Sequence, residues 1–212
     1  MRTLELFCGT KSFSKVAAAH GHGTYTVDSE ASFDPTWCGD IRKWYPGILN
    51  VPVPDVLWAS PPCQGFSVAV IGRNWNRDCT PKSDSARLAM ELVKRTLALI
   101  VALEPTYWFI ENPRGMLRKM PFMEAFMRKH GGVRHTVAYC QYGDTRQKPT
   151  DIWTNCKAWT PRTMCKPGAT CHEAAPRGSR TGTQGLKGAT DRGRIPPAIF
   201  EEIFRHIADT GL

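Results

Sequence analysis

The 212-residue sequence contains no apolar run approaching the roughly 20 residues that a membrane-spanning helix needs. Its start has no charged-then-apolar leader and no small-residue cleavage site, so we expect a soluble protein of the cytoplasm. It has no internal repeat, and its eight cysteines include no Cys-x-x-Cys pair. Nothing in it indicates a membrane or an obligate protein partner. The cysteines are therefore interpreted as thiols or ligands of an intracellular protein.

The composition is that of an ordinary globular chain, with 42% hydrophobic and 22% charged residues. The length suits one well-buried domain with a small appendage and is short for two full domains. The formal net charge is +9, and a basic surface attracts polyanions. Nucleic acid is the natural partner to expect, although many basic proteins bind nothing in particular.

Apolar runs alternate with amphipathic stretches along the chain. The expected strands are 3–7, 25–27, 55–59, 107–110, 135–142 and 151–154, and the expected helices are 12–21, 85–103, 120–130 and a last one opening at 196. This alternation predicts an α/β fold with a doubly wound, mostly parallel sheet that binds ligands at the carboxyl ends of its strands. We expect residues 1–155 to form the main domain, 156–194 a short irregular insert, and 195–212 a helix that returns to the main domain.

The first strand leads into a turn, Phe7-Cys8-Gly9-Thr10-Lys11-Ser12, that has one glycine where a dinucleotide fingerprint has three. Taken alone, the turn is as well explained by tight packing between a strand and a helix. Asp28 ends the second strand, where an acid can bind ribose hydroxyls, and Glu30 is a competing candidate. Asp40, in Gly39-Asp40-Ile41, could face an adenine amino group, although turn aspartates are more often solvated.

A thiol and a carboxyl group follow two further strands. Ser60-Pro61-Pro62-Cys63-Gln64 comes after strand 55–59, and Glu111-Asn112-Pro113 comes after strand 107–110. We expect these two strand ends to converge. A cysteine held in this way is a good nucleophile if its thiolate is stabilised, and a nearby carboxylic acid can polarise the substrate. Taken alone, Cys63 would more often be a small buried thiol.

With these residues the sequence resembles the DNA cytosine-C5 methyltransferase family, and it is most similar to compact members of the kind carried by bacteriophages. The matching motifs follow the family order: Phe7-Cys8-Gly9, Gly39-Asp40-Ile41, Pro62-Cys63-Gln64, Glu111-Asn112, Tyr142-Gly143 and the closing helix after Arg194-Ile195-Pro196. The resemblance spans nearly the whole chain. It implies a Rossmann-like S-adenosylmethionine-dependent methyltransferase that acts on DNA in the cytoplasm of a bacterial host cell, with 1–155 as the catalytic domain.

The resemblance also implies roles for individual residues. Cys63 would add to carbon 6 of a cytosine flipped out of the duplex, Glu111 would hydrogen-bond or protonate N3, and Lys148 would assist them. Residues 66–82 would form the loop that closes over the base. The implied cofactor-binding residues are Phe7, Gly9, Thr10, Lys11, Ser12, Asp28, Asp40, Ile41 and Pro61, and the implied substrate-binding residues are Gln64, Arg73, Asn112 and Pro113.

The sequence departs from the family pattern in three places. Lys11 and Ser12 replace two glycines of the cofactor turn, and the lysine faces the cofactor's carboxylate end or caps the turn in solvent. In the segment 146–150, only Lys148 keeps a positive charge at an expected arginine position. The insert 156–194 replaces a long recognition domain, so we expect a short or relaxed recognition sequence. Its basic residues suit phosphate contact and are Lys157, Arg162, Lys166, Arg177, Arg180, Lys187, Arg192 and Arg194.

The insert also contains Cys156, Cys165, Cys171 and His172, four soft ligands that could bind zinc. Their spacings match no standard zinc finger, and unliganded thiols in a loop are the more usual explanation. We therefore predict no metal, and these four residues remain candidates.

Three rival functions stay open at this point. An RNA cytosine-C5 methyltransferase would use the same nucleophile and acid, but its Cys-Phe-Thr signature is not evident after Glu111-Asn112. A catalytically silent DNA-binding protein on the same scaffold would need neither Cys63 nor Glu111. A nicotinamide oxidoreductase is the most distant, because the glycine fingerprint is incomplete.

Overall fold

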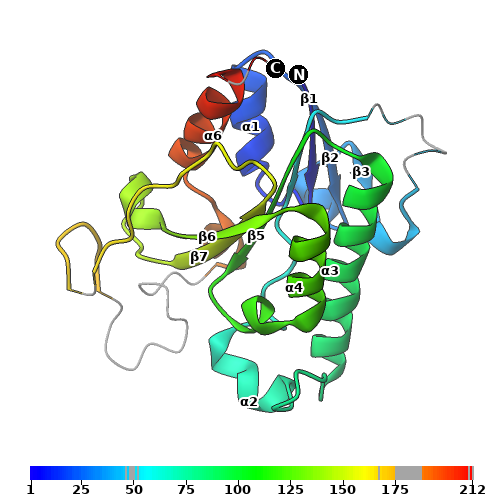
Figure 1. Cartoon of the computed structure of the whole chain (residues 1–212), viewed down its shortest axis with the longest axis vertical. Coiled ribbons are helices and arrows are strands. Elements are labelled where there is room, and N and C mark those ends of the chain that lie inside the picture. The colour runs from blue at the N-terminus through cyan, green and yellow to red at the C-terminus, as the bar shows by residue number, and fades with distance from the viewer. Residues whose placement is uncertain are drawn as a thin grey trace.

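The computed structural model describes residues 1–45, 47, 51, 53–166, 168–174, 188–209 and 211. Within these residues, seven strands form one sheet in the order β3-β2-β1-β4-β5-β7-β6 (Figure 1). Neighbouring strands are parallel except that β7 runs antiparallel to both β5 and β6. The predicted doubly wound, mostly parallel sheet is confirmed. The strands are β1 (Arg2–Leu6), β2 (Gly23–Asp28), β3 (Trp37–Cys38), β4 (Val56–Ala59), β5 (Tyr107–Pro113), β6 (Val133–Ala138) and β7 (Pro149–Thr154).

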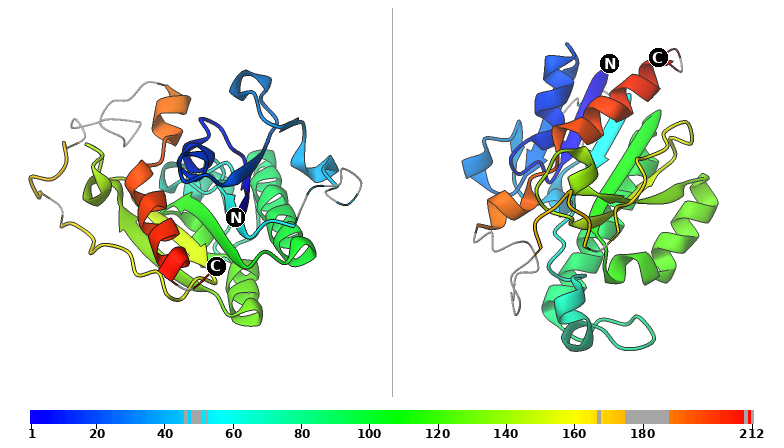
Figure 2. Two further views of the ribbon diagram at one scale, coloured as in Figure 1. Left: turned by 90° about the horizontal axis from the view of Figure 1, so that it is seen from above. Right: turned by 90° about the vertical axis from the view of Figure 1, so that its left-hand side faces the viewer.

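Helices cover both faces of the sheet. Helices α1 (Ser12–Ala19) and α6 (Pro197–Asp209) lie side by side on one face, and α3 (Asp84–Leu103) and α4 (Pro121–His130) lie on the other (Figures 1 and 2). None of the described helices combines the length and the apolar character needed to cross a bilayer. The short elements are α2 (Ile71–Asn74), α5 (Ala189–Gly193) and the 3-10 helices η1 (Ala31–Phe33), η2 (Ile41–Lys43), η3 (Val68–Val70), η4 (Met116–Lys119) and η5 (Tyr139–Tyr142).

Strand β4 lies at the centre of the sheet and is buried on both sides, which explains its uninterrupted apolar sequence. Its side chains alternate between two hydrophobic cores: Leu57 and Ala59 face the core that includes α3, while Val56 and Trp58 face the core that includes α1 and α6. The Trp58 ring lies 4.8 Å from the ring of Phe200 in α6, edge to face. The core therefore holds the end of β4, and the Pro-Pro-Cys turn after it, in a fixed position.

Two expected strands end three or more residues away from their predicted ends. The strand predicted at 135–142 stops at Ala138, because β7 ends its pairing there and the Tyr139 N–H donates to the Gln147 carbonyl at 2.8 Å instead. The chain then turns into η5. Strand β5 continues to Pro113, three residues beyond its predicted end, because β7 goes on pairing with it after β4 has ended.

The insert 156–194 is not wholly separate from the main domain. Cys156 and Trp159 are fully buried in the core with Phe109 and α6. The division at residue 155 stays a prediction. Of the basic residues expected in the insert, Arg177, Arg180 and Lys187 lie outside the described residues.

A buried carboxyl group fixes the turn between β1 and α1. Glu5 of β1 accepts hydrogen bonds from the backbone N–H groups of Phe13, at 3.3 Å, and Ser14, at 2.9 Å. Burial raises the pKa of Glu5 from 4.5 to about 7, although these hydrogen bonds to the carboxylate act in the opposite direction. The start of α1 is thereby attached to the strand that precedes the turn.

We expect Glu5 to make the stability of the fold depend on pH. Because its folded-state pKa lies above the unfolded value of 4.5, its contribution is present below that value and is lost as pH rises through about 7. A shift of this size corresponds to about 3 kcal/mol of unfolding free energy. Urea unfolding between about pH 4.5 and about pH 8 should therefore show a loss about 3 kcal/mol larger in the unmodified protein than in Glu5→Gln.

The control for this comparison is Glu124→Gln, which removes an exposed carboxyl group of α4. This variant should keep the pH dependence of the unmodified protein. If the unfolding free energies of the unmodified protein and of Glu5→Gln changed equally with pH, the assignment of this pH dependence to Glu5 would be contradicted.

Candidate active site

The turn after β1 brings the ends of β1 and β2 together. Phe7, Gly9 and Lys11 adopt left-handed backbone conformations, with φ of 58°, 45° and 57°. The Cys8 N–H donates to the Val27 carbonyl at 3.1 Å, and the Gly9 N–H donates to the Asp28 carboxylate at 2.9 Å. The two residues expected to mark the cofactor site, Gly9 and Asp28, are thus in direct contact.

A cavity of about 830 Å³ lies beside this turn, within the size range of cofactor sites. Of the predicted cofactor-binding residues, Gly9, Thr10, Lys11 and Ser12 line it, whereas Phe7, Asp28, Asp40, Ile41 and Pro61 do not. The other walls come from η1, from the end of η5 and from the start of α6. They include Ser32, Phe33, Tyr142, Gly143, Asp144, Arg194, Ile195 and Pro196.

The acids near the turn already have partners in the protein. The two Asp28 carboxylate oxygens accept from the N–H groups of Gly9 and Glu30, both at 2.9 Å, and the Glu30 carboxylate accepts from the Ser32 N–H at 3.2 Å. Asp40 pairs with Arg42 at 2.6 Å, and hydrogen bonds from Arg42 lower the pKa of Asp40. The role of each acid toward a cofactor stays a prediction.

Lys11, which stands where the family pattern has a glycine, points toward η1. Its ammonium group contacts the carbonyl oxygen of Asp34 and lies 3.4 Å from the Asp34 carboxylate. Its side chain is about one-quarter exposed, so it neither extends into solvent nor is fully buried. The lysine therefore ties the turn to the chain after β2.

The predicted nucleophile and acid lie on adjacent strands. Cys63 is in the turn after β4, and the Asn112 side-chain amide of β5 donates to the Pro61 carbonyl of that turn at 2.9 Å. Glu111 was expected after a strand but lies within β5, paired with Ile152 of β7, because β5 extends beyond β4. The extension brings Glu111 to the level of the Pro-Pro-Cys turn.

Glu111 is only 5% exposed, and the Tyr139 hydroxyl donates to its Oε1 at 2.9 Å. Burial raises the pKa of Glu111, while the Lys148 ammonium and the hydrogen bond from Tyr139 act to lower it. A raised pKa favours the neutral acid, which can donate a proton or a hydrogen bond. No sequence signal pointed to Tyr139, which was expected only as part of a strand.

The cation of the site is Lys148. Its Nζ donates to the Arg192 carbonyl at 2.8 Å and lies 4.7 Å from the centre of the Tyr139 ring. Burial lowers the pKa of Lys148, and the neighbouring Glu111 and Cys63 oppose this shift. Burial and then Glu111 raise the pKa of the Cys63 thiol, whereas Lys148 and Arg192 act to lower it. Cys63, Glu111 and Lys148 therefore form one electrostatically coupled cluster.

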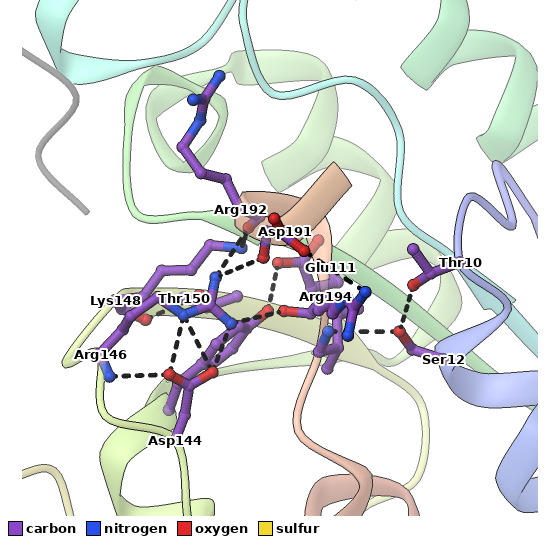
Figure 3. Close-up of polar contacts among 12 residues, drawn as sticks. Thr10, Ser12, Glu111, Asp144, Arg146, Lys148, Thr150, Asp191, Arg192 and Arg194 are labelled. Carbon is purple, nitrogen blue, oxygen red and sulfur yellow. Dashed lines mark hydrogen bonds and ion pairs between the residues drawn. The ribbon is translucent and has the colours of Figure 1, made fainter. Parts of the chain in front are cut away.

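Arg146 holds the chain that covers this cluster. Figure 3 shows its guanidinium between the Asp144 carboxylate and the chain segment 191–194. It contacts Asp144 and donates to the carbonyls of Asp191, at 3.0 Å, Arg192, at 3.2 Å, and Arg194, at 3.1 Å. The sequence showed Arg146 only as a departure from the family pattern. Asp144, two residues earlier in the sequence, was the signal that Arg146 could form a buried ion pair.

The predicted substrate-binding residues are spread over a wider area. Asn112 is buried at the centre, Pro113 is partly buried, and Gln64 and Arg73 are exposed. The 66–82 loop is anchored where it begins. Phe66 stacks on Trp75 at 5.3 Å between ring centres, and the Trp75 indole N–H donates to the Gly65 carbonyl at 2.7 Å. Arg73, in α2, thus projects from an anchored loop.

Three of the four metal candidates come together, but with a different fourth member. Cys165, Cys171 and His172 lie with Cys140 of η5, and their ligand atoms are all within 4.8 Å of one another. The inclusion of Cys156 was wrong, because this residue is fully buried in the core beside α6 and is not part of the group.

Comparison with known sequences gives a consistent result. Residues 1–125 match the sequence profile of the family described as C-5 cytosine-specific DNA methylase. The chain is also 33% identical, over 221 aligned residues, to a "Probable DNA (cytosine-5)-methyltransferase" of Frog virus 3 (isolate Goorha). That alignment covers 96% of this chain and 98% of the viral protein.

Solved structures share the fold. A DNA modification methyltransferase encoded within an E. coli prophage superposes with a TM-score of 0.54 at 19% identity, over 73% of this chain and 46% of that one. The S. pombe Dnmt2 methyltransferase gives 0.52 at 16% identity, over 77% and 53%. This chain therefore spans about half the length of these two structures.

The charges around Cys63 predict opposite effects of two substitutions on the pKa of its thiol. Glu111→Gln removes a neighbouring anion and should lower this pKa, and Lys148→Met removes a neighbouring cation and should raise it. The rate of iodoacetamide alkylation at Cys63, followed against pH by peptide mass spectrometry, measures both shifts. Exposed Cys38 serves as an internal control in the same samples. Shifts in the same direction for both variants would rule out this assignment.

Proposed function

The chain belongs to the C-5 cytosine-specific DNA methylase family, whose methyl donor is S-adenosylmethionine, and we propose that it methylates carbon 5 of cytosine in DNA through a covalent Cys63 adduct. The observation that carries the proposal is the coupled cluster of Cys63, Glu111 and Lys148. It supplies a thiol, a buried acid that favours its neutral form and a cation. These groups fit nucleophilic attack on a ring that is protonated or hydrogen-bonded at the same time.

The cavity beside the β1–α1 turn supports the proposal that S-adenosylmethionine binds there. It has space for a molecule of this size, and the hydroxyl groups of Thr10 and Ser12, 3.0 Å apart, belong to its lining. We assign the binding of S-adenosylmethionine to the four turn residues that line this cavity, Gly9, Thr10, Lys11 and Ser12. Roles for Phe7, Asp28, Asp40, Ile41 and Pro61, which do not line it, rest on the family resemblance alone. The bound cofactor would supply an electrophilic methyl group on a sulfonium centre.

The chemistry begins with the addition of Cys63. A cytosine inside a duplex is out of reach, so the base is flipped into the site. The Cys63 thiolate bonds to carbon 6 while Glu111 donates its proton, or a hydrogen bond, to N3. The ring becomes an enamine, and carbon 5 gains nucleophilic character. Lys148 favours the thiolate by its charge, and Tyr139 holds the carboxyl group of Glu111 in position.

The reaction ends with the loss of Cys63. Carbon 5 would take the methyl group as the methyl–sulfur bond of the sulfonium breaks, its electron pair staying on sulfur. A base, acting through water, then removes the carbon 5 proton, and any proton that Glu111 gave to N3 returns to the Glu111 carboxylate. The electron pair of that C–H bond expels the Cys63 thiolate by β-elimination and restores the aromatic ring. Closure of the 66–82 loop over the base would exclude bulk water during these steps.

We further propose that recognition of the DNA sequence is short or relaxed. Within the described part of the insert, Cys156 and Trp159 are buried and offer no surface for reading bases. Arg162 is occupied by Glu202, at 2.9 Å, and by the Gln141 carbonyl, at 2.7 Å. Lys157 and Lys166 remain exposed and suit phosphate contact, which positions DNA without specifying its sequence.

Covalent trapping tests the mechanism directly. With S-adenosylmethionine and duplex DNA carrying 5-fluorocytosine, we expect the unmodified protein and Cys38→Ser to form a covalent adduct and Cys63→Ser to form none. The fluorine cannot leave as a proton does, so β-elimination is blocked. Glu111→Gln should slow methyl transfer to normal DNA by about 10²-fold or more. Absence of an adduct with the unmodified protein would favour a silent DNA-binding protein.

Specificity and substrate are tested by identifying the methylated nucleosides. Duplex DNA and transfer RNA are incubated with the protein and tritiated S-adenosylmethionine, and the nucleosides are then analysed by mass spectrometry. We expect 5-methylcytosine in DNA, spread over sites that share no more than a short context when the modified DNA is sequenced. Transfer to RNA alone would support the RNA enzyme instead. Methylation confined to one long palindrome would refute relaxed recognition.

A further inference from the structure

We propose that Cys140, Cys165, Cys171 and His172 bind one zinc ion, which fastens the insert to the catalytic domain. The three sulfur atoms and the His172 Nδ1 lie within 4.8 Å of one another, although Cys140 is distant in sequence from the other three. Three thiolates and one imidazole are a ligand set of structural zinc sites. The existence of the site does not depend on the proposed methyl transfer, because none of its four ligands belongs to the catalytic cluster.

Four of the six separations among the ligand atoms are close to those of tetrahedral zinc, and all six lie within 4.8 Å. Bonds of about 2.3 Å to sulfur and about 2.0 Å to nitrogen place two sulfurs about 3.8 Å apart and a sulfur and a nitrogen about 3.5 Å apart. The Cys140 sulfur lies 3.3 Å from that of Cys165 and 3.6 Å from that of Cys171. The His172 Nδ1 lies 3.7 Å from the Cys165 sulfur and 3.5 Å from the Cys171 sulfur. A disulfide would need sulfurs about 2.05 Å apart.

Two glutamine side chains complete the surroundings of the site. The Gln141 amide nitrogen donates to the Cys171 sulfur at 3.3 Å, and the Gln147 amide nitrogen donates to the Cys165 sulfur at 3.2 Å. Amide donors of this kind stabilise the negative charge of metal-bound thiolates and orient the ligands. The outer contacts of a metal site are therefore present together with its four ligands.

The segment that supplies three of the ligands contributes little to the hydrophobic core. After Trp159, none of the described residues from 160 to 174 is fully buried, and none of them belongs to a helix or a strand. Apart from the cluster, it is attached through Arg162, which pairs with Glu202, and through the Glu173 N–H, which donates to the Thr145 carbonyl at 2.9 Å. Binding of a metal ion supplies the folding free energy that such a segment does not gain from a hydrophobic core.

The zinc site would be linked to the active site by residues that are adjacent in sequence. Cys140 follows Tyr139, which donates to Glu111, and Gln147 precedes Lys148. The Gln147 carbonyl also accepts from the Tyr139 N–H at 2.8 Å. The metal would thus hold the two segments that carry the partners of Glu111.

Metal analysis of the whole chain, purified without chelators under reducing conditions, tests the site. We expect one zinc per chain in the unmodified protein and in the control Cys38→Ser, and a loss of most of the zinc in Cys165→Ser and Cys171→Ser. Replacement of zinc by cobalt should give the intense visible absorption of tetrahedral cobalt with thiolate ligands. Gln147→Ala, which keeps all four ligands, should weaken cobalt binding about tenfold.

Several results would overturn the proposal. They are a metal-free unmodified protein after zinc addition and dialysis, full zinc content in Cys165→Ser and Cys171→Ser, or a cobalt spectrum without thiolate bands. A disulfide joining two of the three cysteines would also refute it. If the serine variants fail to fold, the zinc content and cobalt spectrum of the unmodified protein still decide the question. Methylation activity is not used as a readout, so failure of the proposed function leaves this test intact.

Discussion

Strand β5 is longer than its neighbour β4, and the active site depends on that difference. β5 pairs with β4 only as far as Ile110 and then continues along antiparallel β7 to Pro113. Successive side chains of a strand point to opposite faces, so Asn112 and Glu111 can serve different partners. The Asn112 amide holds the Pro-Pro-Cys turn, and the Glu111 carboxyl meets the Tyr139 hydroxyl. One antiparallel strand thereby positions both the proposed nucleophile and the proposed acid.

The buried charges of the site are balanced by a fixed set of partners. The guanidinium of Arg146 has five N–H donors, and its contacts with Asp144 and with the carbonyls of residues 191, 192 and 194 can use all of them. A lysine could not reproduce this planar arrangement. Because Lys148 donates to the carbonyl of residue 192, Arg146 indirectly fixes the cation beside Glu111 and Cys63.

The sequence was sufficient for the features that depend on local pattern. Alternating apolar runs predicted the sheet and its main helices, and the motifs at Cys63 and Glu111 predicted which strand ends would meet. Contacts between distant segments could not be predicted. Tyr139, just after the early end of β6, meets Glu111 of β5, and Cys140 of η5 meets Cys165, which lies 25 residues later in the chain. Cys156 has the same chemistry as Cys140, but its neighbour Trp159 draws that stretch into the core.

The packing of α6 on α1 affects how the chain folds during its synthesis. Phe13 of α1 lies 5.5 Å from Phe200 and 5.4 Å from Phe204, ring centre to ring centre, so the core on this face joins residues from the two ends of the chain. During synthesis, β1 and α1 leave the ribosome long before α6. Until α6 follows, the apolar face of α1 that includes Phe13 stays exposed to solvent. Contacts of such high sequence separation form late and slowly. The nascent chain is thus a natural client for chaperones until α6 is released.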